Sequence, residues 1–332
     1  MRGFGYMKKI LITTVPFAKT NNLPIELLES AGIDYCINPL NKKLTSDELM
    51  EMINEYDGVI AGTEEINREV LDNAPNLKII SRVGVGLDSV DLNTAKEKNI
   101  IVTYTPDAPA PAVAELAIGN MLSLLRGTHI SNLMMHNKKW ERIFGRRIPE
   151  VTIGIIGAGR IGGRVLRRLS AFGTPRILVN DMSPNLNVAP QLKIEWVDKK
   201  TIFKESDVIS IHVPLTKITR NMIKTEEINL MKDDALLINT ARGGIINECD
   251  LADALNSKKI GGAAIDVFDS EPYTGPLSEI DRCLLTSHMG SMSVDCRSRM
   301  EIEATEEVVR YFSGNNLKNI VPETEYNMQS EI

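Results

Sequence analysis

The chain has 332 residues, of which 43% are hydrophobic and 25% are charged, and its formal net charge at pH 7 is −6. This composition is typical of globular proteins and excludes disordered and collagen-like chains, while the length suggests two domains. The negative charge disfavours nucleic acid and anionic membrane surfaces as partners. No run of 18 apolar residues occurs, so we expect no membrane-spanning helix.

The N-terminus and the cysteines both indicate a cytoplasmic protein. Residues 1–10 lack an apolar stretch followed by a small-residue cleavage site, so we expect no signal peptide. The four cysteines, Cys36, Cys249, Cys283 and Cys296, form no CxxC pair. We therefore expect reduced thiols and no zinc site. Only four histidines occur, which leaves few candidates for a histidine-based mechanism.

The first hundred or so residues alternate short apolar runs with segments of helical spacing. The apolar runs at 8–14, 57–62 and 77–86 predict buried strands, and the segments at 23–32 and 45–56 predict helices. Alternation of this kind is typical of parallel, doubly wound sheets. We therefore predict a protein of the α/β class.

The middle of the chain begins with a proline-rich joint at 105–112 and a long apolar helix at 113–126. The basic stretch at 136–147 allows a nucleic-acid interpretation, but the negative overall charge and the sparse aromatic residues favour a solvated helix and arm. A second α/β unit begins near Val151, and a long helix at 294–314 follows its last strand. We expect the polar residues after this helix to be loose.

The segment 151–169 carries the strongest signal in the sequence. Gly157, Gly159 and Gly162 form the pattern GxGxxG, which follows an apolar strand and opens a helix. The first glycine permits a tight turn, the second lets the backbone approach a pyrophosphate, and the third allows close packing of helix on strand. The N–H groups at the helix start then face the anion. The strand and helix on either side make a chance glycine-rich turn a poor alternative, so the pattern predicts a dinucleotide site.

The next predicted strand, at 175–181, ends in Asp181, nineteen residues after the last glycine of the motif. A carboxylate at this place accepts hydrogen bonds from a ribose 2′-hydroxyl and repels a 2′-phosphate. The sequence therefore favours NAD over NADP.

Polar residues follow four later strands, where this fold places its ligands. These residues are His212, Arg242, Asp266 with Glu271, and His288. An arginine can bind a carboxylate in a bidentate manner, and a histidine can exchange a proton near neutral pH. A glutamate beside that histidine favours the imidazolium and fixes the orientation of the ring. The other strand-end histidine, His212, is better interpreted as a pocket wall, because His288 already fits the proton-exchanging role.

At these residues the sequence resembles the D-isomer-specific 2-hydroxyacid dehydrogenase family, and most closely its phosphoglycerate dehydrogenase-like branch. The resemblance extends over nearly the whole chain, and the matching segments occur in the family's order. They are RVGVGLDSVDL (82–92), TPDAP…AVAEL (within 105–117), GIIGAGRIG (154–162), NTARGGIIN (239–247), DVFDSEP (266–272) and SHMGS (287–291).

The resemblance implies catalytic and substrate-binding roles for particular residues. Arg242 would bind the substrate carboxylate and carbonyl, His288 would be the acid/base, and Glu271 would be the partner of His288. The backbone around Val85 and Gly86 would meet the substrate carboxylate.

NAD is the implied cofactor, and no metal is implied. Arg160 and Ile161 would line the pyrophosphate, residues 212–214 the adenine side and residues 240–241 the nicotinamide ribose, while Asp266 would hold the nicotinamide amide. The full set of implied cofactor contacts is Gly157, Gly159, Arg160, Ile161, Gly162, Asp181, His212, Val213, Pro214, Thr240, Ala241, Asp266, His288 and Gly290.

The family fold implies two doubly wound parallel-sheet domains, Rossmann-like and flavodoxin-like, with a cleft between them. Residues 1–103 and 292–332 would form the substrate domain, and residues 104–291 the inserted NAD-binding Rossmann domain. Family members commonly dimerise through the cofactor domain, so we expect a homodimer built with an arm at 127–150.

Two positions bear on whether the substrate carries a phosphate. Arg82 matches an arginine of phosphoglycerate-specific members, which place another arginine where this chain has Ala61. The resemblance favours oxidation of D-3-phosphoglycerate, and reduction of hydroxypyruvate, glyoxylate or another 2-oxo acid is the alternative. Formate oxidation is disfavoured, because formate-specific relatives pair the histidine with glutamine rather than with a residue like Glu271. An alternative of another class is an NAD-sensing, corepressor-like binding protein, which would bind NADH and oxidise it negligibly.

Overall fold

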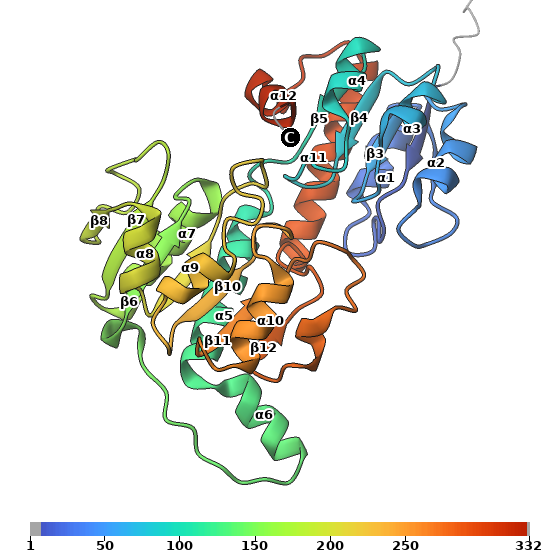
Figure 1. Cartoon of the computed structure of the whole chain (residues 1–332). Helices are drawn as coiled ribbons and strands as arrows, with labels where there is room; N and C mark the ends of the chain where they lie inside the picture. Colours follow the sequence, from blue (N-terminus) through green and yellow to red (C-terminus); the bar gives the residue numbers. More distant parts are fainter. Residues whose placement is uncertain (1–7, 331–332) are drawn as a thin grey trace, which may run out of the picture. The chain divides into compact units, whose positions relative to one another are not determined.

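The computed structural model describes residues 8–330, arranged as two α/β units (Figure 1). Unit 1 comprises the described residues up to Pro109 together with those from Met292 onward, and unit 2 comprises Ala110–Ser291. The first boundary lies six residues after the expected one, because Tyr104 and Thr105 donate backbone hydrogen bonds to partners in unit 1. The N-terminal residues over which we expect no signal peptide lie largely outside the described range.

Unit 1 is built on a five-stranded parallel sheet with the strand order β2-β1-β3-β4-β5. This order is the flavodoxin-like arrangement of doubly wound folds. The strands are β1 (Lys9–Ile12), β2 (Asp34–Ile37), β3 (Gly58–Ala61), β4 (Ile79–Arg82) and β5 (Ile101–Thr103). Strands β3 and β4 are buried at every residue, as expected of strands covered by helices on both faces.

The helices of unit 1 start at recognisable capping residues. Thr45 and Glu48 form a capping box at the start of α2, while the side chains of Asn67 and Asp91 cap α3 and α4. The helices are α1 (Leu23–Ser30), α2 (Ser46–Ile53), α3 (Arg68–Asp72), α4 (Leu92–Glu97), α11 (Val294–Phe312) and α12 (Glu323–Ser330).

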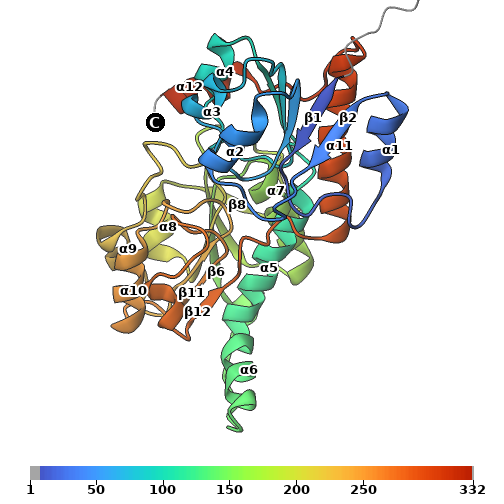
Figure 2. The same ribbon diagram turned by 90° about the vertical axis from the view of Figure 1, so that its right-hand side faces the viewer.

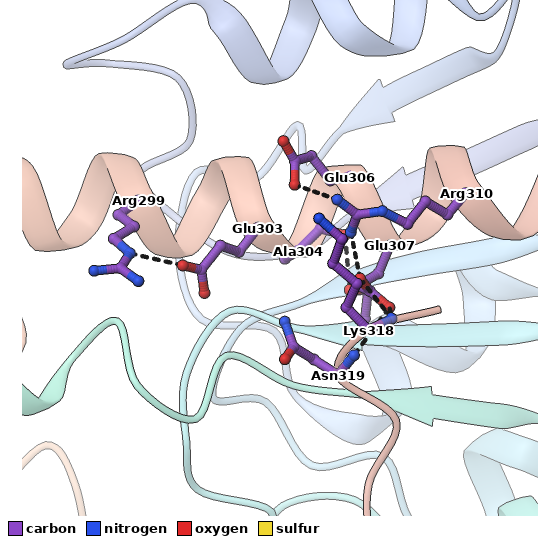
Figure 3. Close-up of polar contacts among 9 residues, drawn as sticks. Arg299, Glu303, Ala304, Glu306, Glu307, Arg310, Lys318 and Asn319 are labelled. Atoms are coloured by element: carbon purple, nitrogen blue, oxygen red, sulfur yellow. Dashed lines mark hydrogen bonds and ion pairs between the residues drawn. The ribbon is translucent and has the colours of Figure 1, made fainter. Parts of the chain in front are cut away.

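The long helix α11 returns the chain to unit 1 and anchors the segment that follows it. The carboxylate of Glu307, 1% exposed, accepts hydrogen bonds from Arg310 and from the backbone N–H groups of Lys318 and Asn319 (Figure 3). On the same unit, the Ser81 hydroxyl donates to the Ala304 carbonyl at 2.8 Å. The Glu307 contacts hold residues 318–319 against α11, and the Ser81 contact joins α11 to β4.

The expectation that the chain is loose after α11 is wrong. Residues 323–330 form helix α12, and Val321 and Tyr326 are buried in the core of unit 1. The Gln329 side chain accepts a hydrogen bond from Leu92 N–H at 2.7 Å and donates one to the Val90 carbonyl at 2.7 Å. Two apolar side chains and one amide thus order a segment whose composition is polar.

Unit 2 contains a seven-stranded parallel sheet with the order β12-β11-β10-β9-β6-β7-β8. Its strands are β6 (Thr152–Ile156), β7 (Arg176–Asn180), β8 (Ile194–Trp196), β9 (Val208–Ile211), β10 (Leu236–Asn239), β11 (Gly262–Ile265) and β12 (Cys283–Leu285). The winding direction reverses between the neighbours β6 and β9, which is the switch point where such sheets bind dinucleotides.

Helices cover both faces of this second sheet and one of them extends beyond it. They are α5 (Ala110–Arg126), α6 (Thr128–His136), α7 (Arg160–Leu169), α8 (Lys199–Glu205), α9 (Thr225–Leu230) and α10 (Glu248–Asn256), with short 3₁₀ turns at Ile148–Glu150, Ser170–Phe172 and Pro276–Glu279. Figure 2 shows α6 continuing from the end of α5, away from the sheet of its own unit. No helix within residues 8–330 is long and apolar enough to cross a membrane.

Candidate functional site

Two positions, one in the loop after β6 and one in the first turn of α7, accept only glycine. Gly157 has φ +92°, and a Cβ there would lie 2.5 Å from the His212 carbonyl oxygen. A Cβ on Gly162 would lie 1.9 Å from the carbonyl oxygen of Gly157. Strand β6, strand β9 and helix α7 therefore approach one another more closely than any side chain allows.

The start of helix α7 is open to a ligand. Its N-cap residue, Gly159, has no side chain to bind the first N–H groups, and nothing lies within 4 Å of its ideal Cβ position. A ten-residue helix with uncapped N–H groups presents both hydrogen-bond donors and the positive end of its dipole. The loop fits the pyrophosphate of a dinucleotide, and Arg160 and Ile161 form the first turn beside it.

Asp181 follows β7 and is bound to the same loop. One oxygen of its carboxylate accepts a hydrogen bond from Ala158 N–H at 2.7 Å, and the other accepts from Ser183 N–H at 2.8 Å. The side chain is partly exposed, so its remaining lone pairs can accept from a ribose hydroxyl. The negative charge is thereby fixed beside the predicted pyrophosphate loop.

His212 begins the segment 212–214 after β9. Its Nε2 lies 2.9 Å from the Ser210 hydroxyl, and its buried Nδ1 has no hydrogen-bond partner in the described part of the chain. Burial lowers the pKa of His212 to about 4, so the ring is neutral at pH 7. A neutral, fixed ring agrees with the interpretation of His212 as a pocket wall, and the expected contacts of Val213 and Pro214 with the cofactor stay predictions.

The turn after β10 is held by a residue that the sequence analysis missed. The Asn239 side chain accepts from Ala241 N–H at 3.0 Å and donates to the Arg242 carbonyl at 2.8 Å. The hydroxyl of Thr240 is buried without a hydrogen-bond partner within the described range. An unsatisfied buried hydroxyl is uncommon, and a ribose hydroxyl would satisfy it. Asparagine at the end of an apolar strand is a turn signal that could have identified Asn239 from the sequence.

Arg242 completes that turn, and its Nη1 donates to the Ala241 carbonyl at 2.6 Å. The residue after it packs directly on the next loop, since a Cβ on Gly243 would lie 1.9 Å from the Phe268 carbonyl oxygen. The loops that carry Arg242 and Glu271 are therefore in contact.

His288 and Glu271 form a hydrogen-bonded pair within unit 2. The Nδ1 of His288 lies 2.8 Å and 3.0 Å from the two carboxylate oxygens of Glu271, and Phe268 N–H donates to Glu271 at 3.1 Å. The two side chains are 42% and 30% exposed, so the imidazole is held on one side and reachable on the other. His288 has φ +49°, a left-handed conformation that a non-glycine residue adopts at a cost.

Asp266 holds the loop that carries His288. Its carboxylate is fully buried and accepts hydrogen bonds from the Thr286 hydroxyl at 2.5 Å and from the N–H groups of Met289 and Gly290 at 2.9 Å. Burial raises the pKa of Asp266, and these hydrogen bonds and the charge of His288 partly oppose the rise. Every hydrogen bond of this side chain is internal to unit 2, and contact with a nicotinamide amide stays a prediction.

Three expected substrate-binding residues lie in unit 1, around the end of β4. Arg82 is buried and its Nη1 donates to the Val83 carbonyl at 2.9 Å. The loop beyond it, which contains Val85 and Gly86, is fixed by a hydrogen bond of 2.8 Å from Gly84 N–H to Thr105. The expected site residues thus fall into two groups, one in each unit. Within the described range, no group of three or more histidine, cysteine or acidic side chains is placed to hold a metal ion.

Residues 118–290 match the sequence family described as "D-isomer specific 2-hydroxyacid dehydrogenase, NAD binding domain". The chain belongs to this family. The chain is 40% identical over 277 residues to a hydroxypyruvate reductase of Thermotoga maritima, covering 81% of this chain and 89% of that protein. It is 38% identical over 322 residues to a D-3-phosphoglycerate dehydrogenase of Methanocaldococcus jannaschii, covering 95% of this chain but only 59% of that protein.

A solved structure shows the same fold over almost the full chain. It is the D-lactate dehydrogenase of Aquifex aeolicus complexed with NAD and lactic acid, with a TM-score of 0.84, 26% identity, and coverage of 95% of this chain and 99% of that one. The family consists of NAD-dependent oxidoreductases acting on 2-hydroxy acids, and NAD is the cofactor of this family member. The α/β class, the two doubly wound parallel sheets and the NAD cofactor are confirmed.

Asp181 should make the enzyme prefer NADH to NADPH. A 2′-phosphate beside this carboxylate is repelled and loses its hydrogen bonds, so kcat/KM should favour NADH by roughly ten- to a hundredfold. Asp181→Asn should lower the ratio of kcat/KM for NADH to kcat/KM for NADPH. Asp198→Asn, which removes a carboxylate that caps helix α8 instead, is the matched control and should leave the preference unchanged. Equal kcat/KM of the wild type for the two cofactors would contradict the role of Asp181.

The low pKa of His212 should make stability depend on pH. An unfolded histidine takes up a proton near its ordinary pKa of 6.5, whereas folded His212 does so only at about 4. Its contribution to the free energy of unfolding is therefore present above pH 6.5 and is lost as the pH falls towards 4. Urea unfolding at pH 7 and at pH 4.5 measures how far the free energy of unfolding falls between the two pH values, and this fall should be smaller in His212→Gln than in wild type. His136 is exposed, so His136→Gln is the control and should show the same fall as wild type. A fall in His212→Gln equal to that of wild type would contradict the role of His212.

Proposed function

We propose that the protein catalyses the reversible reduction of a short 2-oxo acid to the D-2-hydroxy acid, with NADH as hydride donor. The observation that carries this proposal is the His288–Glu271 pair on the loops next to Arg242, at the carboxyl edge of the dinucleotide-binding sheet. An arginine, a carboxylate and an imidazole at this edge can bind a carboxylate, orient a ring and transfer a proton. In this proposal unit 2 binds the cofactor and unit 1 binds the substrate.

His288 supplies the proton of the reaction. Because Nδ1 is occupied by Glu271, the other ring nitrogen, Nε2, is the one that donates a proton to the carbonyl oxygen during reduction and accepts it during oxidation. Glu271 fixes the orientation of the ring by its two contacts with Nδ1. Phe268 N–H fixes Glu271 in turn.

Arg242 binds and polarises the substrate. Its guanidinium is a donor that can form a bidentate contact with the carboxylate and can approach the adjacent carbonyl oxygen. Asn239 fixes the backbone on both sides of this arginine, which reduces the reorganisation needed when substrate binds. Backbone N–H groups near Val85 and Gly86 in unit 1 provide the second contact to the substrate carboxylate.

Hydroxypyruvate and glyoxylate are the substrates we propose. Ala61, fully buried at the end of β3, offers no charge for a substrate phosphate, and a relative of which this chain covers 89% is named a hydroxypyruvate reductase. A relative named D-3-phosphoglycerate dehydrogenase and the presence of Arg82 support 3-phosphohydroxypyruvate as the second candidate. Retention of Arg242, Glu271 and His288 in these positions favours catalysis over a binding protein that only senses NADH.

A homodimer is proposed from the surface of unit 2. Helix α6 and the segment after it expose a set of large apolar side chains that a second copy of the chain would cover. These are Leu133, Met135, Trp140, Ile143 and Phe144, with Phe144 fully exposed. Exposed apolar groups at this density mark interaction surfaces.

His288→Asn should fold and bind NADH but lose roughly 10²–10⁴-fold in turnover, the usual contribution of a general acid/base. Asparagine accepts the left-handed backbone at this position, so the loop is preserved. Turnover with hydroxypyruvate and glyoxylate, together with an NADH binding titration, measures both quantities. His136→Asn, at the exposed end of α6, is the control. Half of the wild-type turnover in His288→Asn would show that another group transfers the proton.

Arg82→Ala distinguishes the two substrate candidates. If Arg82 binds a substrate phosphate, its loss should lower kcat/KM for phosphohydroxypyruvate by roughly 10- to 150-fold relative to hydroxypyruvate, as expected for charge-assisted hydrogen bonds. The measurement is the ratio of the two kcat/KM values in wild type and variant. A wild-type ratio near one that is unchanged in Arg82→Ala would remove the phosphorylated candidate, while Ala61→Arg should raise the ratio if the end of β3 faces the substrate.

A further inference from the structure

The loop at 267–273 carries Glu271 and is closed by its own side chains. The rings of Phe268 and Tyr273 stack with their centroids 4.1 Å apart and their planes inclined by 20°. Glu271 lies between these two residues in the chain, and its carboxylate accepts a hydrogen bond from Phe268 N–H at 3.1 Å. Because Phe268 contacts both Tyr273 and Glu271, the placement of this short loop determines the placement of the Glu271 carboxylate.

A carboxylate on the neighbouring helix α10 binds this loop. Glu248 is the first residue of α10, and one of its oxygens accepts a hydrogen bond from Asp269 N–H at 2.8 Å. The preceding N–H group, that of Phe268, donates to Glu271 instead. Two consecutive N–H groups of the loop thus bind two different carboxylates. The bond to Glu248 therefore fixes the peptide next to the one that holds Glu271.

Glu248 also borders the turn that carries Arg242. A cavity of about 10 Å³ within unit 2 is lined by Glu248 together with Asn239 and Gly243. Gly243 follows Arg242 and lies against the loop that carries Glu271, since a Cβ on Gly243 would lie 2.5 Å from Asp269 N. Glu248 is consequently placed where two loops of the proposed active site meet.

The charges near Glu248 come from the same loop. Burial raises the pKa of Glu248, and the hydrogen bond from Asp269 N–H opposes this rise. The carboxylates of Asp269 and Glu271 lie near enough to raise that pKa further, while the Tyr273 hydroxyl lowers it. Arg220 pairs with Asp269 at 3.5 Å, but both side chains are exposed, so this ion pair contributes little to holding the loop. The hydrogen bond to Glu248 is the firmer contact.

We propose that Glu248 is a positioning residue for proton transfer and acts through Glu271. By holding the loop, Glu248 holds the carboxylate that lies 2.8 Å from His288 Nδ1, and so the direction in which Nε2 points. Proton transfer depends steeply on geometry, and a small misplacement can lower turnover by up to about a hundredfold. The inference rests on the proposed function, because it names a further residue of the same site.

The test compares Glu248→Ala with Glu248→Gln, using NADH with glyoxylate and with hydroxypyruvate. Glutamine keeps an Oε1 that can accept from Asp269 N–H, whereas alanine has no acceptor. We expect kcat to fall roughly ten- to a hundredfold in Glu248→Ala, with KM and the Kd of NADH changed less than about threefold. Glu248→Gln should keep kcat within about threefold of wild type, because it retains the hydrogen bond.

The matched control is Asp250→Ala. Asp250 lies in the same first turn of α10, and its carboxylate accepts a hydrogen bond from Thr225 N–H at 2.8 Å. Its removal therefore takes away a charge at the same helix start and a bond of the same kind, but that bond holds the start of α9. We expect kcat to change less than about threefold in Asp250→Ala, because a charge at the helix start contributes to stability alone.

A double variant identifies the residue through which Glu248 acts. Glu271→Ala leaves no carboxylate to be positioned, so adding Glu248→Ala should lower kcat by less than about twofold more, as for residues that act as a unit. Losses that multiply in the double variant would show that Glu248 acts by another route, and would overturn the inference.

The remaining outcomes separate the inference from the proposed function. Wild-type kcat in Glu248→Ala, a loss confined to KM, an equal loss in Glu248→Gln or an equal loss in Asp250→Ala would each overturn the role of Glu248. If Glu248→Ala does not fold, Glu248→Asp replaces it, since aspartate keeps the charge at the helix start and withdraws the acceptor by one methylene. Its kcat should fall at least about fivefold, and wild-type kcat would contradict the inference.

Activity of the wild type decides the proposed function independently of these variants. Reduction of glyoxylate or hydroxypyruvate by the wild type leaves the proposed function intact, whatever the result for Glu248. Reduction of neither substrate would overturn both the proposed function and the inference.

Discussion

The buried carboxylate of Asp266 is the group on which the loop that carries His288 depends. It receives the Thr286 hydroxyl and the N–H groups of Met289 and Gly290, while its own carbonyl accepts from His288 N–H at 2.8 Å. One residue at the end of β11 thus fixes the segment after β12. Without these donors a fully buried carboxylate would be strongly unfavourable, and the raised pKa of Asp266 expresses the part of that cost that remains.

The loop after β6 is also fixed by contacts within unit 2. There the closely packed backbone has the role that the hydrogen bonds of Asp266 have in the loop after β12. Gly157 and Gly162 allow β6, β9 and α7 to meet at distances that no Cβ permits. Asp181 then binds Ala158 N–H and joins the end of β7 to this loop. Two halves of the sheet that wind in opposite directions are therefore fixed at the point where they separate, and the uncapped start of α7 keeps its orientation.

Local patterns made much of this architecture predictable. The alternation of strands and helices gives the α/β class, the glycine spacing gives the dinucleotide loop, and the long apolar run at 113–126 corresponds to helix α5. Each of these signals lies within a few residues of the feature that it predicts. The pairing of His288 with Glu271 is different, because the two residues are 17 positions apart and the family resemblance implied it.

Other features depend on contacts between segments that are distant in the sequence. Helix α12 is ordered by Gln329 binding residues more than two hundred positions earlier, so its polar composition is misleading. The internal hydrogen bonds of Asp266 require β11 and β12 to be neighbours. Composition and spacing contain no information on these pairings until the strand order is known.

The left-handed conformation of His288 has a consequence for how this position can change. A functional replacement must tolerate the positive φ of residue 288 and must also exchange a proton, and these two requirements are independent. Glycine, asparagine and aspartate meet the backbone requirement alone, whereas β-branched residues meet neither and would also disturb the donors to Asp266. A relative that had lost catalysis but kept the cofactor site would therefore carry one of only a few amino acids at this position. A valine or isoleucine there would indicate that the loop had changed its conformation.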